Sequence, residues 1–273
     1  MSTSDGRPAP ATAARALARR LGAGDPLVAL LAKMPCAAQV EAAGHAGFDL
    51  VVVDTEHGPG DALELEHHVR AAQAVGLAVL VRVPSASPPA ILAALDAGAT
   101  GVVVPHVVDA AGAEAVVAAA HYPPRGRRGL ATSTRAGGYG AVPLAEHLRR
   151  AAEETCVVVQ VEDAEAVPLA GEILAVPGVS GVLIGANDLS VSLGHPGALS
   201  NPDVEAAIGA IYAAGARTGT PVLAVVGSEP DAVTACERGA AVLVSVATTL
   251  VHGAFLAAVA TARRARGAAQ VGD

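Results

Sequence analysis

The sequence predicts a single (β/α)8 barrel, and three observations lead to this fold class. Short valine-rich runs alternate with alanine-rich stretches from about residue 26 almost to the end of the chain. The valine-rich runs are apolar throughout, which is typical of parallel strands buried on both faces. Eight such runs occur, and eight alternations in 273 residues fit a closed barrel better than an open doubly wound sheet, which stays the alternative.

The apolar runs have strand length, and the stretches between them have the composition of helices. The strands are expected at 26–31, 50–54, 78–83, 101–107, 156–162, 181–185, 221–226 and 240–247. Helices between them include 61–75, 89–97, 110–120, 165–175, 203–218 and 230–239. Several helices end in glycine, as at Gly76, Gly98 and Gly239, which suits a left-handed C-terminal cap.

Two further helices are expected outside this alternation. One covers 12–21, before the first strand, and the other covers 249–266, with arginines in its last turns that complement the helix dipole. The expected organisation is therefore an N-terminal extension and helix over 1–25, followed by one barrel domain over 26–273. Between 107 and 156 the stretch "YPPRGRRGLATSTRAGGYG" is too rich in Pro, Gly and Arg for a connecting helix, and it predicts an extended loop on the active face.

Composition excludes several classes of partner. The net charge is −8 and aromatic residues make up 2% of the chain, so neither a nucleic acid nor an anionic membrane surface is expected to bind. No apolar window is long enough to span a bilayer, and the N-terminus lacks the apolar core of a secretory signal, so a cytoplasmic protein with a small-molecule ligand is expected. Cys36, Cys156 and Cys236 are far apart without a CxxC pair, which predicts reduced and mostly buried thiols.

Polar residues end four of the predicted strands. In a barrel, side chains at the carboxyl ends of the strands line the site, so these residues are expected to converge on one rim. They are Asp54, Glu56 and His57 after the second strand, Arg82 in the third, Gln160 and Glu162 in the fifth, and Asn187 and Asp188 after the sixth. An acid at a strand end can also be a helix cap or a turn former, but polar residues at successive strand exits favour a site.

The residue types at this rim predict chemistry on a small acid. Glu162 and Asp188 come from neighbouring strand ends, where two carboxylates repel unless a cation separates them; oxygen ligands without cysteine favour Mg²⁺ or Mn²⁺ over zinc. Arg82 offers a fork for a substrate carboxylate. His57 is the candidate base, with Asp54 expected to orient its imidazole.

Other polar residues receive a smaller role or none. Glu56, His106 and Arg135 are candidates for a supporting position around the site, whereas His67 and His68 lie mid-helix and are expected at the surface. Neither a GxSxG nucleophile elbow nor a Walker or GxGxxG phosphate loop follows a strand. A serine hydrolase or a nucleotide-binding site is therefore not expected.

Several of these segments together resemble the HpcH/HpaI aldolase family, metal-dependent pyruvate aldolases related to citrate lyase β-type enzymes. The segments occur in the family's order, and they are "VVVDTEHGP", "VLVRVP", "GVVVPHV", "YPPRGRRG…RAGGYG", "VVVQVED" and "GVLIGANDLSVSLGHPG". The resemblance runs from about residue 27 to the eighth strand. It implies a (β/α)8 barrel whose last helix is exchanged between subunits, commonly in a hexamer.

The resemblance also implies roles for individual residues. Glu162 and Asp188 match the metal ligands, His57 and Asp54 the base and its acid, and Arg82 the arginine that holds the pyruvate carboxylate. Gln160 matches an amide near the keto group, and the backbone around Asn187 and Asp188 a carboxylate-binding turn. Thr55 departs from the family, which often has Gly there, as does Asn187, where a small apolar residue is common.

The implied reaction is the reversible cleavage of a 4-hydroxy-2-oxo acid to pyruvate, or an analogue, and an aldehyde. The implied cofactor is Mg²⁺ or Mn²⁺, with Co²⁺ also suitable, and no organic cofactor. No lysine stands at the strand exits singled out, which disfavours a Schiff-base aldolase. Two alternatives stay open: a lyase for a citryl or malyl CoA thioester, whose phosphates could meet the arginines of 125–135, and a catalytically silent barrel that binds a keto acid.

Overall fold

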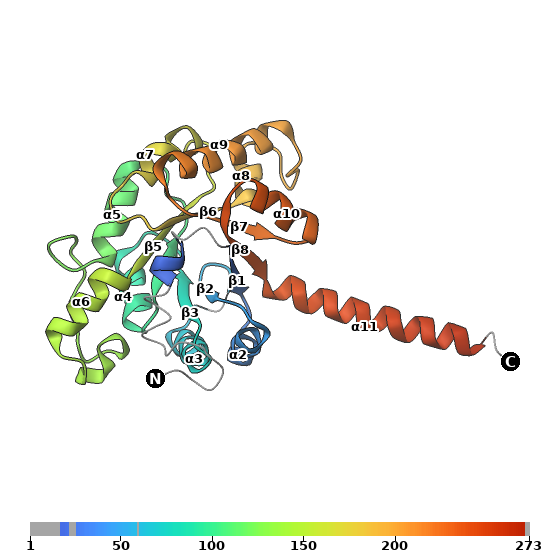
Figure 1. The fold of residues 1–273 in the computed structure, drawn as a ribbon, viewed down its shortest axis with the longest axis horizontal. Coiled ribbons are helices and arrows are strands. Elements are labelled where there is room, and N and C mark those ends of the chain that lie inside the picture. Colours follow the sequence, from blue (N-terminus) through green and yellow to red (C-terminus); the bar gives the residue numbers. More distant parts are fainter. Residues whose placement is uncertain (1–16, 22–25, 59, 271–273) are drawn as a thin grey trace.

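Eight parallel strands form a closed barrel in the computed structural model, which describes residues 17–21, 26–58 and 60–270 (Figure 1). Each strand pairs with the next along the chain, and β8 pairs with β1. The strands are β1 Leu27–Ala32, β2 Leu50–Asp54, β3 Ala78–Arg82, β4 Gly101–Val104, β5 Cys156–Val161, β6 Gly181–Ile184, β7 Val222–Val226 and β8 Ala240–Val246. The predicted fold class is thus confirmed.

Helices follow the strands around the outside of the barrel (Figure 1). They are α2 Ala37–Ala46, α3 Ala62–Ala74, α4 Pro88–Asp96, α5 Ala110–Ala120, α6 Leu144–Glu154, α7 Ala170–Leu174, α8 Ala186–Ser192, α9 Pro202–Thr218, α10 Glu229–Glu237 and α11 Ala247–Gln270, with short 3-10 turns at Arg135–Gly140 (η1) and Val167–Leu169 (η2). The six helices expected between strands are present, and α2, α6 and α8 are additional to them.

The strands separate two apolar layers, because alternate side chains point to opposite faces. Outward-facing side chains such as Val51 and Val53 pack under the helices. Inward-facing side chains such as Leu50 and Val52 fill the barrel interior, together with Leu17 and Leu21 from helical residues 17–21. The end of the predicted N-terminal helix therefore packs against the interior layer, while residues 12–16 of that prediction lie outside the described residues.

The last helix, α11, leaves the barrel instead of packing along it (Figure 1). Its exposed apolar side chains include Leu250, Phe255, Leu256 and Val259. Across the part of the chain that the structure describes, none of the helices has the length and apolar character needed to cross a membrane.

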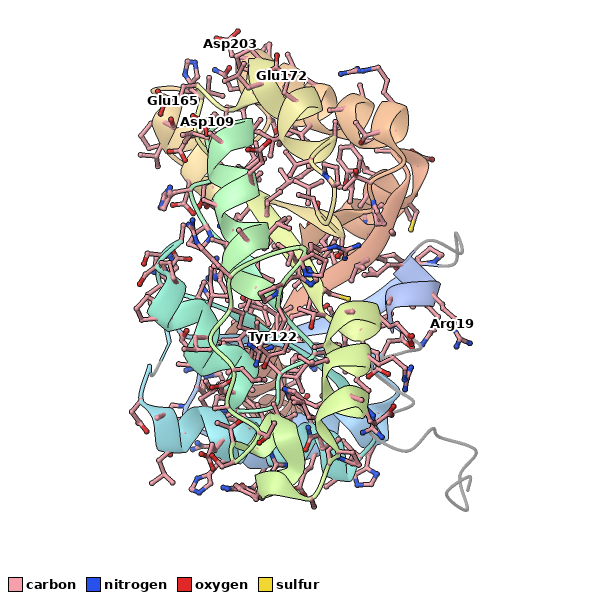
Figure 2. All side chains as sticks on the ribbon, turned by 90° about the vertical axis from the view of Figure 1, so that its left-hand side faces the viewer. Arg19, Asp109, Tyr122, Glu165, Glu172 and Asp203 are labelled. Carbon is pink, nitrogen blue, oxygen red and sulfur yellow. The ribbon has the colours of Figure 1, made fainter. Side chains whose placement is uncertain are left out.

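Three expectations about individual segments are wrong. The arginine-rich stretch after α5 does not lie on the active face: Arg128 bonds Asp96 at the C-terminal end of α4, and Arg135 packs on Gly98, just before β4 begins. The stretch therefore lies at the amino end of the barrel, because a helix that follows a strand returns the chain to that end. In Figure 2, Asp109 and Tyr122 mark the two opposite ends of α5.

The other two concern burial. His68 is buried, and its two ring nitrogens lie 2.7 Å and 3.1 Å from the carbonyl oxygens of Glu64 and Met34, so it joins α3 to the loop after β1. The three cysteines are free, as expected, but only Cys156 is buried. Burial raises the pKa of its thiol to about 12, which makes it an inert apolar side chain.

Candidate active site

Four polar side chains continue the interior face of the barrel at its carboxyl end. Asp54 follows Leu50 and Val52 on the inner face of β2, and Arg82, Gln160 and Glu162 hold the corresponding positions after the inward side chains of β3 and β5. Each of these four residues is at most 5% exposed to solvent. Charges buried to this degree must be paired or must hold an ion, because an isolated buried charge costs several kcal/mol.

Asp54 and Arg82 form a two-pronged ion pair across neighbouring strands. Arg82 Nε donates to Oδ1 at 3.0 Å and Nη2 donates to Oδ2 at 2.6 Å, and the two residues are register partners in β2 and β3. Burial alone would raise the pKa of Asp54, but the hydrogen bonds and charge of Arg82, with two backbone N–H groups, hold it below its usual range. Asp54 is therefore a carboxylate that fixes the guanidinium.

Asp54 also shapes the turn that carries His57. Its Oδ1 accepts the backbone N–H groups of Glu56 and His57, at 3.1 and 3.2 Å. The expected contact between Asp54 and the His57 imidazole is not formed, since the carboxylate faces inward to Arg82. Within the described chain, the carboxylate that lies within 4 Å of the His57 ring is that of Glu56, whose Oε2 is 3.8 Å from Nε2.

Glu162 is held by donors on two sides. Gln160 Nε2 donates to its Oε2, and the backbone N–H of His106 donates to its Oε1 at 3.0 Å. Burial raises the pKa of Glu162, and the charge of Asp188 raises it further, while these hydrogen bonds oppose the shift. Gly185, next to it, has no space for a side chain, because a Cβ there would lie 2.5 Å from Oε2 of Glu162.

The carboxyl end contains a donor set that fits a divalent cation. Glu56, His106 and Glu162 each offer one ligand atom, and these atoms all lie within 4.8 Å of one another. Glu56 Oε2 is buried and accepts no hydrogen bond, although Arg82 Nε lies 3.3 Å away. An ion bound to carboxylate oxygens would neutralise this excess of negative charge.

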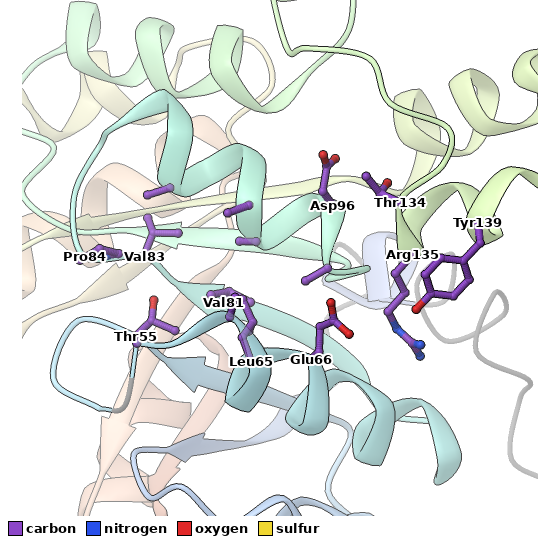
Figure 3. Close-up of a pocket in the computed structure, with 16 residues that line it drawn as sticks. Thr55, Leu65, Glu66, Val81, Val83, Pro84, Asp96, Thr134, Arg135 and Tyr139 are labelled. Atoms are coloured by element: carbon purple, nitrogen blue, oxygen red, sulfur yellow. The ribbon is translucent and has the colours of Figure 1, made fainter.

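The other predicted residues lie in different places. Asn187 and Asp188 are exposed in the first turn of α8, and Asp188 is near enough for its charge to reach Glu162. Arg135 does not join this group. It bonds Gln73 and, with Tyr139, lines a groove of about 390 Å³ between α3 and α4, outside the barrel (Figure 3).

Thr55 borders the same groove, and its role is structural. Its N–H and its hydroxyl both donate to the carbonyl oxygen of Arg82, at 2.9 Å and 2.7 Å. This double contact ties the exits of β2 and β3 together. The threonine that departs from the family pattern therefore supports the backbone of the arginine at the site.

Two residues at the rim were missed from the sequence. Lys33 directly follows β1, and its Nζ lies 3.6 Å from Asp54 Oδ2. Asp163 follows Glu162, and its Oδ2 lies 3.1 Å from His106 Nδ1. The position rule applied to the other strands would have found both, because each stands just beyond the carboxyl end of a strand.

Comparisons with known proteins point to one family of aldolases. The model of the HpcH/HpaI aldolase/citrate lyase family matches residues 31–254. A pyruvate aldolase of Rhizobium etli is 40% identical over 190 residues, covering 70% of this chain and 74% of that protein. A hydroxypyruvate/pyruvate aldolase of Agrobacterium fabrum is 41% identical over 202 residues, covering 72% and 75%.

A solved structure supports the same assignment. The crystal structure of an HpcH/HpaI aldolase/citrate lyase family protein from Burkholderia cenocepacia superposes with a TM-score of 0.87 at 33% identity, covering 91% of this chain and 99% of that one. Together, the match over most of the barrel and the polar layer at its carboxyl end show that the chain belongs to the HpcH/HpaI aldolase/citrate lyase family and is a metal-dependent aldolase, a carbon–carbon lyase.

Proposed function

We propose that this protein reversibly cleaves a 4-hydroxy-2-oxo acid to pyruvate, or a close analogue, and an aldehyde, with Mg²⁺, Mn²⁺ or Co²⁺ and no organic cofactor. The observation that carries the proposal is the buried Arg82, locked by Asp54 beside the carboxylates of Glu56 and Glu162. A cation for the substrate's carboxylate and ligands for a metal thus lie side by side at the carboxyl end of the barrel. The aldolases of Rhizobium etli and Agrobacterium fabrum named above support pyruvate as the common product.

In this proposal Glu162 and Asp188 hold the metal, with Glu56 beside them. A bound divalent ion polarises the keto group of the 2-oxo acid and stabilises negative charge on its oxygen. Asp54 takes the Nε–H and one N–H of Nη2 of Arg82, so the second N–H of Nη2 and the N–H groups of Nη1, one of which donates to Gln160 Oε1 at 3.4 Å, are available to substrate oxygens. Arg82 and Gln160 therefore orient the acid end of the substrate.

His57 is the proposed base. Its side chain is 54% exposed at the rim, so it can reach the C4 hydroxyl of a substrate whose acid end lies deeper. When the imidazole accepts the hydroxyl proton, the C3–C4 bond breaks, the aldehyde forms, and the electron pair moves toward the keto group. C3 then takes up a proton to give the 2-oxo acid product.

Metal removal and two substitutions test the proposal. EDTA should abolish cleavage, and Mg²⁺, Mn²⁺ or Co²⁺ should restore it. His57→Ala should lower kcat by about 10²–10⁴-fold, as expected for loss of a general base, whereas His195→Ala, which changes a histidine in the loop after α8 that pairs with Asp203, should act like the parent. Full activity of folded His57→Ala and Arg82→Ala variants on every substrate that the parent accepts would refute the mechanism.

The two alternatives are less well supported. The arginines of 125–135 lie at the amino end of the barrel, so within this chain they do not flank the site where a CoA thioester would react. CoA-dependent thermal stabilisation would favour that lyase nevertheless. A silent binding barrel would not exchange the methyl protons of pyruvate in deuterated buffer with metal, whereas a working aldolase should.

We also infer that the protein is a homo-oligomer, a hexamer in the arrangement that the family resemblance implies. The support is α11, which stands off the barrel with Phe255, Leu256 and other apolar side chains exposed. Packing this helix on a second copy would remove that apolar surface from water. Light scattering should give a multimer, and a Phe255→Asp/Leu256→Asp variant should shift it to smaller species.

A further inference from the structure

His106 occupies an unusual backbone position at the carboxyl end of β4. Its φ is +55°, a left-handed conformation that few residues other than glycine adopt, although Asn, Asp and His do so more often than the rest. In this conformation its backbone N–H reaches Glu162 Oε1, at 3.0 Å, and its side chain turns toward the carboxylates of β2 and β5. The fold therefore accepts a strained residue where the ring faces the site.

The ring contacts are those of a histidine prepared for a metal. Nδ1 lies 3.1 Å from Asp163 Oδ2 and 3.5 Å from Glu162 Oε1, and Nε2 lies 4.0 Å from Glu56 Oε1. If Nδ1 carries the proton and donates it to Asp163, the lone pair of Nε2 is left on the side of Glu56. Histidine ligands in proteins are typically oriented by such a carboxylate, which accepts the other ring N–H.

The three ligand atoms of Glu56, His106 and Glu162 lie within 4.8 Å of one another, and Glu56 Oε2 lacks a hydrogen bond although it is buried. We propose that the imidazole of His106 is a direct ligand of the divalent ion that Glu162 holds, and that this protein in consequence binds Mn²⁺ and Co²⁺ in preference to Mg²⁺. Imidazole nitrogen suits transition metals, whereas Mg²⁺ prefers oxygen. The inference rests on the proposed function, because the ion is the same.

Two substitutions isolate the imidazole. His106→Asn and His106→Gly both tolerate positive φ and both keep the N–H that donates to Glu162. His57→Asn is the necessary comparison, because the His57 ring is the other imidazole next to Glu56. His195→Asn changes a histidine in the loop after α8 whose ring contacts Asp203 and Asn201, and it serves as the matched control.

The first measurement is pulsed EPR of the full-length protein loaded with Mn²⁺ alone. The parent should show nitrogen hyperfine coupling from a directly bound imidazole. We expect this coupling to persist in His57→Asn and His195→Asn and to vanish in His106→Asn and His106→Gly. Coupling that survives in both His106 variants, or that is absent from the parent, would overturn the inference.

The second measurement is the Kd for Co²⁺ and for Mg²⁺ by calorimetry. Both His106 variants should weaken Co²⁺ binding by about tenfold or more and Mg²⁺ binding by much less. Asp163→Ala should weaken Co²⁺ binding in the same direction, because the ring loses the carboxylate that orients it. Equal losses for the two ions would overturn the inference.

These outcomes separate the inference from the proposed function. If the protein binds Mn²⁺ without a nitrogen ligand and still exchanges the protons of pyruvate, only the role of His106 is lost. If it binds none of Mn²⁺, Co²⁺ and Mg²⁺, the proposed aldolase mechanism fails together with the inference.

Discussion

Both ends of the barrel gather buried charged side chains, but their charge balance differs. At the carboxyl end Arg82 faces Asp54, Glu56 and Glu162, so carboxylates outnumber the guanidinium, and one oxygen of Glu56 accepts no hydrogen bond. Lys33 adds a second cation only at 3.6 Å from Asp54. A bound cation would stabilise this cluster, because it would offset the excess of buried negative charge.

At the amino end Arg128 forms an ion pair and a ring contact inside the chain. Arg128 donates to Asp96 at 2.6 Å and lies over the ring of Tyr122, 4.8 Å from its centroid. The Tyr122 hydroxyl in turn lies 2.9 Å from Nε2 of His147. Arg128 Nε and His121 Nε2 are also buried there without a hydrogen-bond partner. The contacts of Arg128 and Tyr122 hold the segment after α5 in place, so the two ends differ in the sign of the unpaired groups, which are donors on a cationic side chain here and a carboxylate oxygen at the carboxyl end.

The pKa values of two histidines shift in opposite directions at the two ends of the barrel. At the carboxyl end burial would lower the pKa of His106, but Asp163, Glu162 and Glu56 raise it. At the amino end burial, with the charges of Arg125 and Arg128, lowers the pKa of His121 to about 4. The same kind of residue is thus drawn toward the charged form at one end and held neutral at the other, which shows that similar residue types do not make similar sites.

The largest expected effect is that of Arg82→Ala, which should damage both catalysis and folding. Substrate orientation is lost and Asp54 is left buried without its partner, so we expect kcat/KM to fall on the order of 10³-fold and stability to fall by about 3 kcal/mol. Steady-state kinetics and urea unfolding at fixed protein concentration measure the two losses. Arg82→Lys keeps the charge and should recover part of the stability. Unchanged kinetics in a folded Arg82→Ala protein would mean that the carboxyl end, like the amino end, uses its buried arginine for stability alone.

Arg128→Ala should separate stability from catalysis. Breaking the buried pair with Asp96 should cost about 3 kcal/mol, because a carboxylate and an aromatic ring lose their partner together. The rate per folded molecule should stay within about threefold of the parent, a difference worth less than 1 kcal/mol. Arg149→Ala removes an exposed arginine that bridges Glu146 and Glu153 on α6, and it should leave the free energy of unfolding nearly unchanged, because solvent screens exposed ion pairs.

His121→Phe should make the free energy of unfolding less dependent on pH below pH 7. Since the folded pKa of about 4 lies below the unfolded value, the unfolded chain binds the proton first as the pH falls from 6.5 toward 4. The parent should therefore lose about 2 kcal/mol between pH 7 and pH 5 through this group, and the variant should not. Urea midpoints measured at both pH values test this, and equal pH dependence of the two proteins would contradict the burial argument.

The barrel can be predicted from the sequence because the apolar runs that indicate its strands are local and repeated. The eight apolar runs and the rule that sites lie at carboxyl strand ends also brought Asp54, Arg82, Gln160 and Glu162 together correctly. The pattern could not predict which of these side chains form pairs with one another. Asp54 could contact either His57 or Arg82, and only the register of β2 with β3 decides for Arg82.

The arginine-rich stretch was misplaced for a similar reason. Its Pro, Gly and Arg content indicates an irregular segment but does not say to which end of the barrel it belongs. The helix α5 before it settles this, because it carries the chain from the carboxyl end back to the amino end, where Arg128 meets Asp96. His68 was misjudged because its buried partner, the carbonyl of Met34, is distant in sequence.

The smallest expected effect comes from Tyr122→Phe, which tests whether the amino-end cluster is held by single weak contacts. The substitution removes the hydroxyl next to His147 and keeps the ring under Arg128, so the loss should be about 1 kcal/mol, the value of one buried neutral hydrogen bond. Burial and the charge of Arg128 lower the pKa of His147, so its neutral ring accepts a hydrogen bond from the Tyr122 hydroxyl. A double-mutant cycle with His147→Phe, followed by urea unfolding, isolates this contact. A coupling energy near zero would assign the stability of the segment to Arg128 alone, and a changed kcat would mean that the two ends of the barrel are coupled.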